Sequence, residues 1–92
     1  MFLLSVVIPS GQVFEEKVES ISAPGLEGGF EVFSQHMPIL YALKEGIVSI
    51  RKDGKEFRSL KIDSGVLEVN AKHDVLLLAD QILEDSQSPA AK

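Results

Sequence analysis

The sequence predicts an all-β fold of the sandwich or barrel type, arranged as a single domain. Three observations indicate this class: the apolar segments are short, they are rich in Val and Ile, and turn residues separate them at intervals too brief for helices. A chain of 92 residues with 45% hydrophobic and 25% charged residues has ordinary globular composition and can build one core. No amphipathic helix follows the last predicted strand, and no repeat at solenoid spacing is visible in the sequence.

Eight strands are predicted along the chain, with turn residues between them. Pro9 to Gly11 stops the first strand, because proline cannot donate to a ladder and glycine accepts a turn conformation. The second strand alternates imperfectly, so we expect a bulge near Lys17 or Val18. The predicted strands are, in order, Phe2–Ile8, Val13–Ile21, Phe30–Phe33, Ile39–Leu43, Ile47–Arg51, Glu56–Ile62, Val66–Asn70 and Val75–Ala79.

The second half holds the strongest local signal. Asp53-Gly54 between two alternating runs predicts a hairpin with a type I′ turn, because both central positions of that turn need positive φ. The unbroken apolar run Val75–Ala79 predicts a strand buried on both faces. The segment 84–92 is polar, small and interrupted by proline, so we expect a disordered tail after a domain that spans residues 1–83.

Charge and composition exclude several classes of function. The formal net charge of −5 argues against a nucleic-acid partner, which needs clustered Lys and Arg. The absence of cysteine excludes disulfides, thiolate metal sites and a cysteine nucleophile. The apolar start "MFLLSVVIPSG" lacks the basic segment of a signal peptide and predicts a strand. No run approaches the roughly 18 apolar residues of a membrane span, so we expect contact with a membrane only indirectly, through partners.

The candidate catalytic groups do not form a recognisable motif. Gly25, Gly28 and Gly29 lack the lysine of a phosphate-binding loop and precede a strand, so they predict a tight turn. Of the two histidines, His36 is predicted to bond nearby backbone in its turn, and His73 to be exposed. No serine stands in a nucleophile elbow. We therefore expect no catalytic residues, no cofactor and no metal.

One enzymatic alternative stays open on the sequence. Histidines in the loops of a β fold are compatible with a small metal-dependent β-barrel enzyme. Its ligands would be His36 and His73 together with Glu27, Glu31 or Asp74. A further alternative, an adaptor domain for an unrelated partner, would use exposed apolar residues instead.

The order of the motifs resembles a known family. "VFEEKVESI", "GLEGGFEVFSQHMPILYALKEGIVSI" and "IDSGVLEVNAKHDVLLLAD" together are similar to the N-terminal domain of the epsilon subunit of F-type ATP synthase, called delta in mitochondria. The resemblance spans residues 4 to 82. The matching positions are Phe14, Val18, Gly25, Gly28, His36, Pro38, Leu40, Gly46, Gly65, Glu68, Val69, Ala79 and Asp80. Ser34-Gln35 departs from the Pro-Gly or Pro-Asn usual before the histidine, which makes it the first place to look for unusual backbone.

The resemblance implies a fold and a function. The fold would be a flattened β-sandwich of about ten short strands. The function would be that of a non-catalytic rotor subunit on the central stalk, which binds the gamma subunit and the c ring and helps couple proton or sodium flow to ATP synthesis. Its place would be peripheral, at the cytoplasmic face of the bacterial inner membrane or the organellar equivalent. Family members usually continue into an inhibitory helical hairpin, and this sequence ends at "QILEDSQSPAAK", so inhibition and nucleotide sensing are not expected.

The resemblance also implies two contact surfaces. The loop that faces the c ring would consist of Leu26, Glu27, Gly28, Gly29, Phe30 and Glu31, with Glu27 as the charged contact. The face toward gamma would hold Ile8, Ser10, His36, Pro38 and Leu40. The residues alone point the same way, since a small sandwich cannot turn every apolar side chain near Ile8 and in Met37 to Tyr41 inward, and exposed apolar patches mark partner surfaces.

Overall fold

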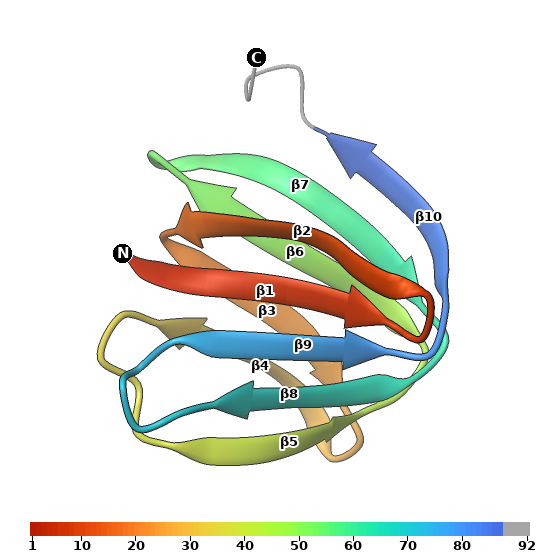
Figure 1. The fold of residues 1–92 in the computed structure, drawn as a ribbon, viewed down its shortest axis with the longest axis horizontal. Coiled ribbons are helices and arrows are strands. Elements are labelled where there is room, and N and C mark those ends of the chain that lie inside the picture. The colour runs from red at the N-terminus through yellow and green to blue at the C-terminus, as the bar shows by residue number, and fades with distance from the viewer. Residues whose placement is uncertain (88–92) are drawn as a thin grey trace.

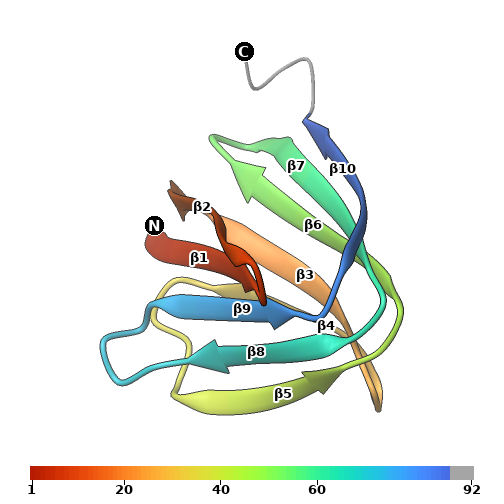
Figure 2. The same ribbon diagram turned by 45° about the vertical axis from the view of Figure 1, so that its right-hand side comes forward.

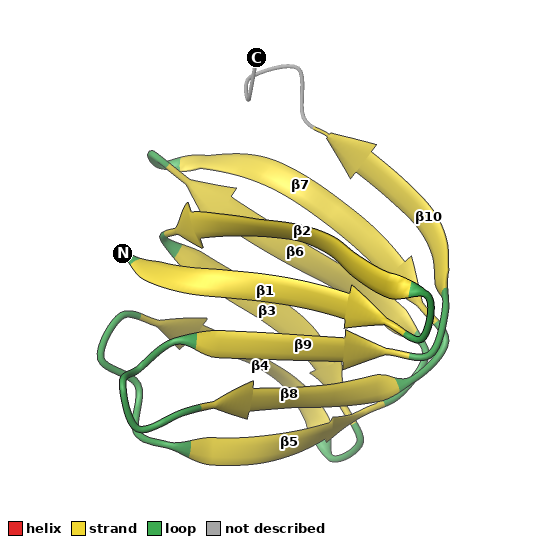
Figure 3. Ribbon diagram, in the orientation of Figure 1, coloured by secondary structure: helices red, strands yellow, loops and turns green. Residues whose placement is uncertain are grey.

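The computed structural model describes residues 1–87, and all of their regular structure is β-strand. Figure 3 shows strands joined by short loops. Within these residues no helix is long and apolar enough to cross a membrane. The strands are β1 Phe2–Ile8, β2 Gly11–Val18, β3 Ser20–Gly25, β4 Gly28–Phe33, β5 Ile39–Leu43, β6 Gly46–Lys52, β7 Lys55–Ile62, β8 Gly65–Val69, β9 Val75–Ala79 and β10 Ile82–Gln87.

The strands form one curled sheet that packs against itself. Its order is β10-β7-β6-β3-β5-β8-β9-β1-β2, and β4 pairs with the free side of β3. In Figures 1 and 2 the front layer contains β5, β8, β9, β1 and β2, and the back layer contains β3, β4, β6, β7 and β10. The prediction of an all-β sandwich of about ten short strands is confirmed.

The core lies between the two layers. Alternate residues of each strand point inward, as the pleat of a β-strand requires. Leu4 and Leu77 of the front layer are completely buried, as are Ile50 and Leu60 of the back layer. One cluster of buried residues therefore joins both layers and forms the core of the domain.

The predicted second strand, Val13–Ile21, is in fact two strands. The chain passes from the front layer to the back layer at Glu19, whose backbone N–H donates to the carbonyl of Arg51 (2.8 Å). The alternation within Val13–Ile21 is imperfect because the two halves of this segment belong to different layers. The bulge is also not near Lys17: the register slips where Val6 and Val7 face Phe14 and Gln12, which leaves Val13 as the extra residue.

The C-terminal end differs from the prediction as well. A disordered tail was expected from Glu84, whereas β10 continues through Gln87 and pairs antiparallel with β7. A polar strand suffices here because β10 lies at the sheet edge and is held by ladder bonds and by an ion pair between Arg58 and Asp85. Residues 88–92 lie outside the described part of the chain, and a domain boundary at residue 83 stays a prediction.

Two local expectations have opposite outcomes. Asp53 (φ 56°) and Gly54 (φ 77°) both have positive φ, which confirms the type I′ hairpin. By contrast, Val75–Ala79 is not buried on both faces, because Leu78 is 43% exposed while Leu77 is fully buried. The core covers only one face of β9, and the apolar residues on its other face need a different explanation.

Candidate functional site

The loop predicted to face the c ring is the tip of the β3–β4 hairpin. Gly25 pairs with Gly28, so Leu26 and Glu27 form the turn between them. A Cβ at Gly25 would lie 2.6 Å from the carbonyl oxygen of Gly28, and Gly28 has a φ of +131°, so both positions need glycine. The strand therefore begins at Gly28 rather than at Phe30, and the glycines build a tight hairpin, as the sequence predicted, with Leu26 61% exposed at its tip.

This hairpin tip is fixed against β5. The N–H of Leu26 donates to the carbonyl of Ala42 (3.0 Å), and the rings of Phe30 and Tyr41 stack with centroids 3.8 Å apart. A shallow pocket of about 370 Å³ lies between residues 25–30 and 40–42. Leu40, predicted to face gamma, thus lies beside the loop predicted to face the c ring. The two surfaces meet at this pocket.

The residues predicted to face gamma do not form one patch. Strand β9 is parallel to β1, and β8 is antiparallel to both β9 and β5, so β1 and β5 run in the same direction. Ile8 at the end of β1 therefore lies at one end of the front layer, and Pro38 before β5 lies at the other. Ser10 follows Ile8 and His36 precedes Pro38, which divides the predicted set into two groups.

The predicted apolar patch is present in a smaller form. Met37 and Leu40 are 67% and 66% exposed, and Ile39 is 38% exposed. Ile8 and Tyr41, which were expected to contribute, are half-buried and pack against the core instead. Both side chains belong to the inward-facing rows of their strands, with Leu4 and Val6 on β1 and Leu43 on β5.

The two histidines are brought together by backbone contacts. Nδ1 of His73 lies 2.9 Å from the carbonyl oxygen of His36, and Nδ1 of His36 lies 2.9 Å from that of Met37. Because carbonyl oxygens only accept, each Nδ1 is the donor. The prediction that His36 bonds nearby backbone is confirmed. The prediction that His73 is exposed is wrong, since this bond holds it half-buried.

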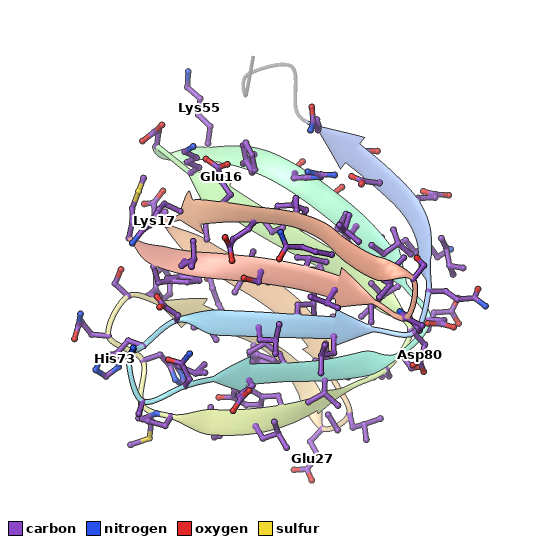
Figure 4. The ribbon with its side chains drawn as sticks, viewed as in Figure 1. Glu16, Lys17, Glu27, Lys55, His73 and Asp80 are labelled. Atoms are coloured by element: carbon purple, nitrogen blue, oxygen red, sulfur yellow. The ribbon has the colours of Figure 1, made fainter. Side chains whose placement is uncertain are left out.

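The carboxylates of the metal-enzyme alternative are engaged elsewhere. Asp74 accepts from the N–H of Leu3 (3.1 Å), Glu31 accepts from Ser20 (3.1 Å), and Glu27 lies on the hairpin tip away from His73 (Figure 4). Among residues 1–87 no three His, Cys, Asp or Glu side chains gather in a position to hold a metal ion. The alternative therefore has no ligand set in the described part of the chain.

Sequence reasoning missed apolar residues on the outer surface of the front layer, namely Val7, Val66 and Leu78. Their neighbours in sequence are buried, so an apolar run such as "VLLLA" looks like core throughout. The available signal was the length of that run combined with the small size of the domain, which offers no second core to cover the outer face of β9.

A small β-sandwich that exposes apolar side chains offers the kind of surface that binds partner proteins. Comparison with known proteins shows its family. Residues 1–85 match the model of the family described as "ATP synthase, Delta/Epsilon chain, beta-sandwich domain". The chain belongs to this family.

Curated relatives agree over nearly the whole chain. It is 34% identical over 91 residues to the ATP synthase epsilon chain of Sulfurimonas denitrificans, covering 97% of this chain and 70% of that one. It is 38% identical over 79 residues to the epsilon chain of Chlorobium limicola, covering 86% and 90%. The family consists of non-catalytic subunits, so the prediction that the chain is not by itself an enzyme is confirmed.

Solved structures support the same fold. A chain of the Tetrahymena thermophila mitochondrial ATP synthase central stalk and c ring superposes with a TM-score of 0.77 at 15% identity, over 90% of this chain and 66% of that one. A chain of the Euglena gracilis mitochondrial ATP synthase gives 0.81 at 21% identity, over 89% and 52%. At these identities the likeness concerns the fold.

Proposed function

We propose that this protein is a non-catalytic rotor subunit of an F-type ATP synthase, which binds gamma and the c ring and helps couple ion flow to ATP synthesis. One observation carries the proposal beyond family membership: a hairpin tip and an adjoining strand expose Leu26 and Leu40 side by side on a rigid support. Apolar side chains in such a cluster favour contact with partner proteins.

The c ring contact would be made by the hairpin tip. Leu26 supplies apolar area, and Glu27 supplies one negative charge for a basic group on a polar loop of the ring. Glu31, the other acidic residue of this loop, accepts a hydrogen bond from Ser20, so apolar contact outweighs electrostatics here. The stack of Phe30 on Tyr41 and the bond from Leu26 to Ala42 keep the tip from yielding when it is pressed against a partner.

The place of the protein follows from these partners. A subunit that rests on the c ring is peripheral to the membrane and held there only through the complex. We place it at the cytoplasmic face of the bacterial inner membrane, with the organellar equivalent as the other setting.

Gel filtration with the matching gamma subunit tests the proposal. At micromolar concentration the two folded proteins should elute together, since stable contacts of standard size reach at least that affinity. Separate elution of two folded partners would contradict the proposal, and it would leave an adaptor for another partner as the remaining function.

The c ring contact has its own test. In a pull-down on purified c ring loaded with gamma, Leu26→Glu should reduce retention of the chain. Leu83→Glu is the matched control, because Leu83 is also exposed (45%) but lies on β10, at the other end of the strand order. Equal retention of both variants would show that the hairpin tip does not touch the ring.

A further inference from the structure

The strands at the two ends of the strand order are held very differently. β2 keeps Val18 fully buried and packs Phe14 against the core. β10 contributes Ile82 to the core, and its other five residues are exposed. Its neighbour in the sheet is β7, which keeps β6 as a partner on the other side. The core between the layers therefore does not depend on residues 83–87.

The chain is anchored where β10 begins. The backbone N–H of Gln81 donates to Oδ1 of Asp63 (3.0 Å), in the turn that follows β7. Ile82 then pairs with Ile62, which is fully buried. These contacts fix the chain as far as Ile82.

The ladder between β10 and β7 is interrupted at Leu83. Ile82 and Glu84 face successive residues of β7, so Leu83 is an extra residue without a partner across the ladder, and it is 45% exposed. A bulge of this kind disrupts pairing locally and bends the strand. It separates the anchored Ile82 from residues 84–87, which resume the pairing with β7.

One side-chain interaction fastens residues 84–87 to the sheet. Asp85 lies opposite the fully buried Leu60, so the two side chains share the core-facing side of the sheet. There the Asp85 carboxylate accepts two hydrogen bonds from Arg58 (2.9 and 2.7 Å). Glu84 lies on the opposite face of the strand, and it forms no ion pair with the part of the chain that the structure describes.

We propose that residues 84–87 form a releasable strap, which swings away from β7 about Leu83 while the rest of the sandwich stays folded, and that the Arg58–Asp85 pair is the latch that holds it closed. Segments that open locally are those with few buried apolar contacts. The inference goes beyond the proposed function and does not depend on gamma or the c ring.

Release of the strap changes the edge of the sheet. Residues 58–61 of β7 lose their ladder partner on that side, while β6 still pairs with them on the other. Arg58 stays in position, because its guanidinium also stacks on Phe14 (4.1 Å from the ring centroid). An uncovered strand edge pairs readily with extended segments of other chains, so the latch controls whether this edge is available.

Native-state hydrogen exchange measures the opening of the strap directly. In the unmodified chain the amides of residues 84–87 that bond to β7 should exchange about tenfold or more faster than the amides shared by β8 and β9. Low concentrations of urea should accelerate exchange of the β8 and β9 amides and leave the strap amides nearly unchanged, because release of a short segment exposes little surface.

Asp85→Asn tests the latch. The substitution keeps the shape of the side chain and removes its charge, so exchange at residues 84–87 should become about fivefold faster or more. Glu84→Gln is the matched control, because it removes the same charge from the opposite face of the same strand. It should change these rates by less than about twofold. Circular dichroism establishes that each variant is folded.

A reversible disulfide supplies a second control. The chain contains no cysteine, and Ser86 lies directly opposite Ser59 of β7. In a chain that carries both Ser59→Cys and Ser86→Cys, oxidation should slow exchange at residues 84–87 to the rate of the β8 and β9 amides. Reduction of the same sample should restore the faster exchange.

Two results would overturn the proposal. If residues 84–87 of the unmodified chain exchange as slowly as the β8 and β9 amides and respond equally to urea, they do not open separately. If Asp85→Asn exchanges no faster than Glu84→Gln, the Arg58–Asp85 pair is not the latch. Neither measurement involves gamma, so failure of the strap is distinguishable from failure of the proposed function.

Discussion

Two regions of the curled sheet, the place where β2 lies over the back layer and the outer surface of the front layer, differ in how their side chains are satisfied. Where β2 lies over the back layer, the guanidinium of Arg58 stacks on Phe14 (4.1 Å from the ring centroid) and forms two hydrogen bonds with Asp85 (2.7 and 2.9 Å). Lys52 pairs with Glu16 beside it. We call this the seam. The β9 docking face is our name for the outer surface made by Val7, Ala42, Val66 and Leu78. There, in contrast, Ala42 and Leu78 are exposed, Val7 and Val66 are half-buried, and no ion pair covers them among residues 1–87.

The difference separates stability from binding. Groups in the seam satisfy one another, so their loss should lower the free energy of unfolding and leave partners unaffected. Groups on the β9 docking face have little to lose within the domain, so their change should leave folding intact and weaken gamma binding. Each prediction below tests one side of this distinction.

The largest effect is expected at Gly65, beneath the β9 docking face. A Cβ there would lie 2.2 Å from the backbone carbonyl oxygen of Leu78, which cannot move without separating β8 from β9. Gly65→Ala should lower the free energy of unfolding by about 3 kcal/mol or more. Chemical denaturation measures it.

Gly29→Ala is the control for Gly65→Ala. The nearest atom to a Cβ at Gly29 is 3.8 Å away, so this variant should stay within about 1 kcal/mol of the unmodified chain. Similar losses at both glycines would mean that the two layers do not differ in how closely their strands approach one another.

Arg58→Ala should produce the next largest effect, in the seam. Its side chain is 14% exposed, and the substitution removes the pair with Asp85 and the stack on Phe14. We expect a loss of about 2 kcal/mol in the free energy of unfolding, with gamma affinity unchanged. The exposed Lys55 supplies the control, since Lys55→Ala should change stability by less than about 0.5 kcal/mol. A drop in gamma affinity for folded Arg58→Ala would break the separation between seam and docking face.

Features that depend on local chemistry were predicted correctly, and features that depend on pairing between distant parts of the chain were missed. The Asp53-Gly54 hairpin and the turn glycines depend on φ values that only a few residue types accept, so local sequence suffices for them. The split of Val13–Ile21 between two layers depends on the pairing of Glu19 with Arg51, which lies far along the chain. The row from Ala42 to Val7 depends on register across four strands, which a single sequence does not contain. The hairpin tip of the candidate site could therefore be predicted from the sequence, and the apolar row across the front layer could not.

A smaller effect on folding is expected at Leu40, beside the docking face. Leu40 is 66% exposed, so Leu40→Gln should change the free energy of unfolding by no more than about 0.5 kcal/mol. Leu40 pairs with Glu68 on the outer surface, in the row next to Ala42 and Val66. Gamma affinity should still fall several-fold if gamma also covers this row. Thermal melts and binding measured on the same sample separate the two readouts. Loss of stability with unchanged binding would reverse the assignment of this residue.

The smallest effect concerns the Ser34-Gln35 turn, which precedes the front layer and was singled out for unusual backbone. Gln35 has a φ of 66°, in the left-handed region where a side chain costs about 1 kcal/mol or more. Gln35→Gly removes that cost but adds about 0.4 to 1 kcal/mol of unfolded-chain entropy, so a net gain of about 0.5 kcal/mol in the free energy of unfolding is expected.

Ser34→Gly is the matched control for Gln35→Gly, since Ser34 is not among the described residues with positive φ. It adds the same entropy to the unfolded chain without relieving strain, and should lower stability by about 0.4 to 1 kcal/mol. Opposite signs at adjacent positions, read from urea midpoints at equal slopes, would show that the turn before β5 stores strain. Because His36 follows directly and its carbonyl holds His73 in place, gamma affinity should be the same for both variants if gamma docks on β9. If Gln35→Gly raises the affinity for gamma and Ser34→Gly lowers it, in parallel with stability, the contact with gamma lies at this end of the layer.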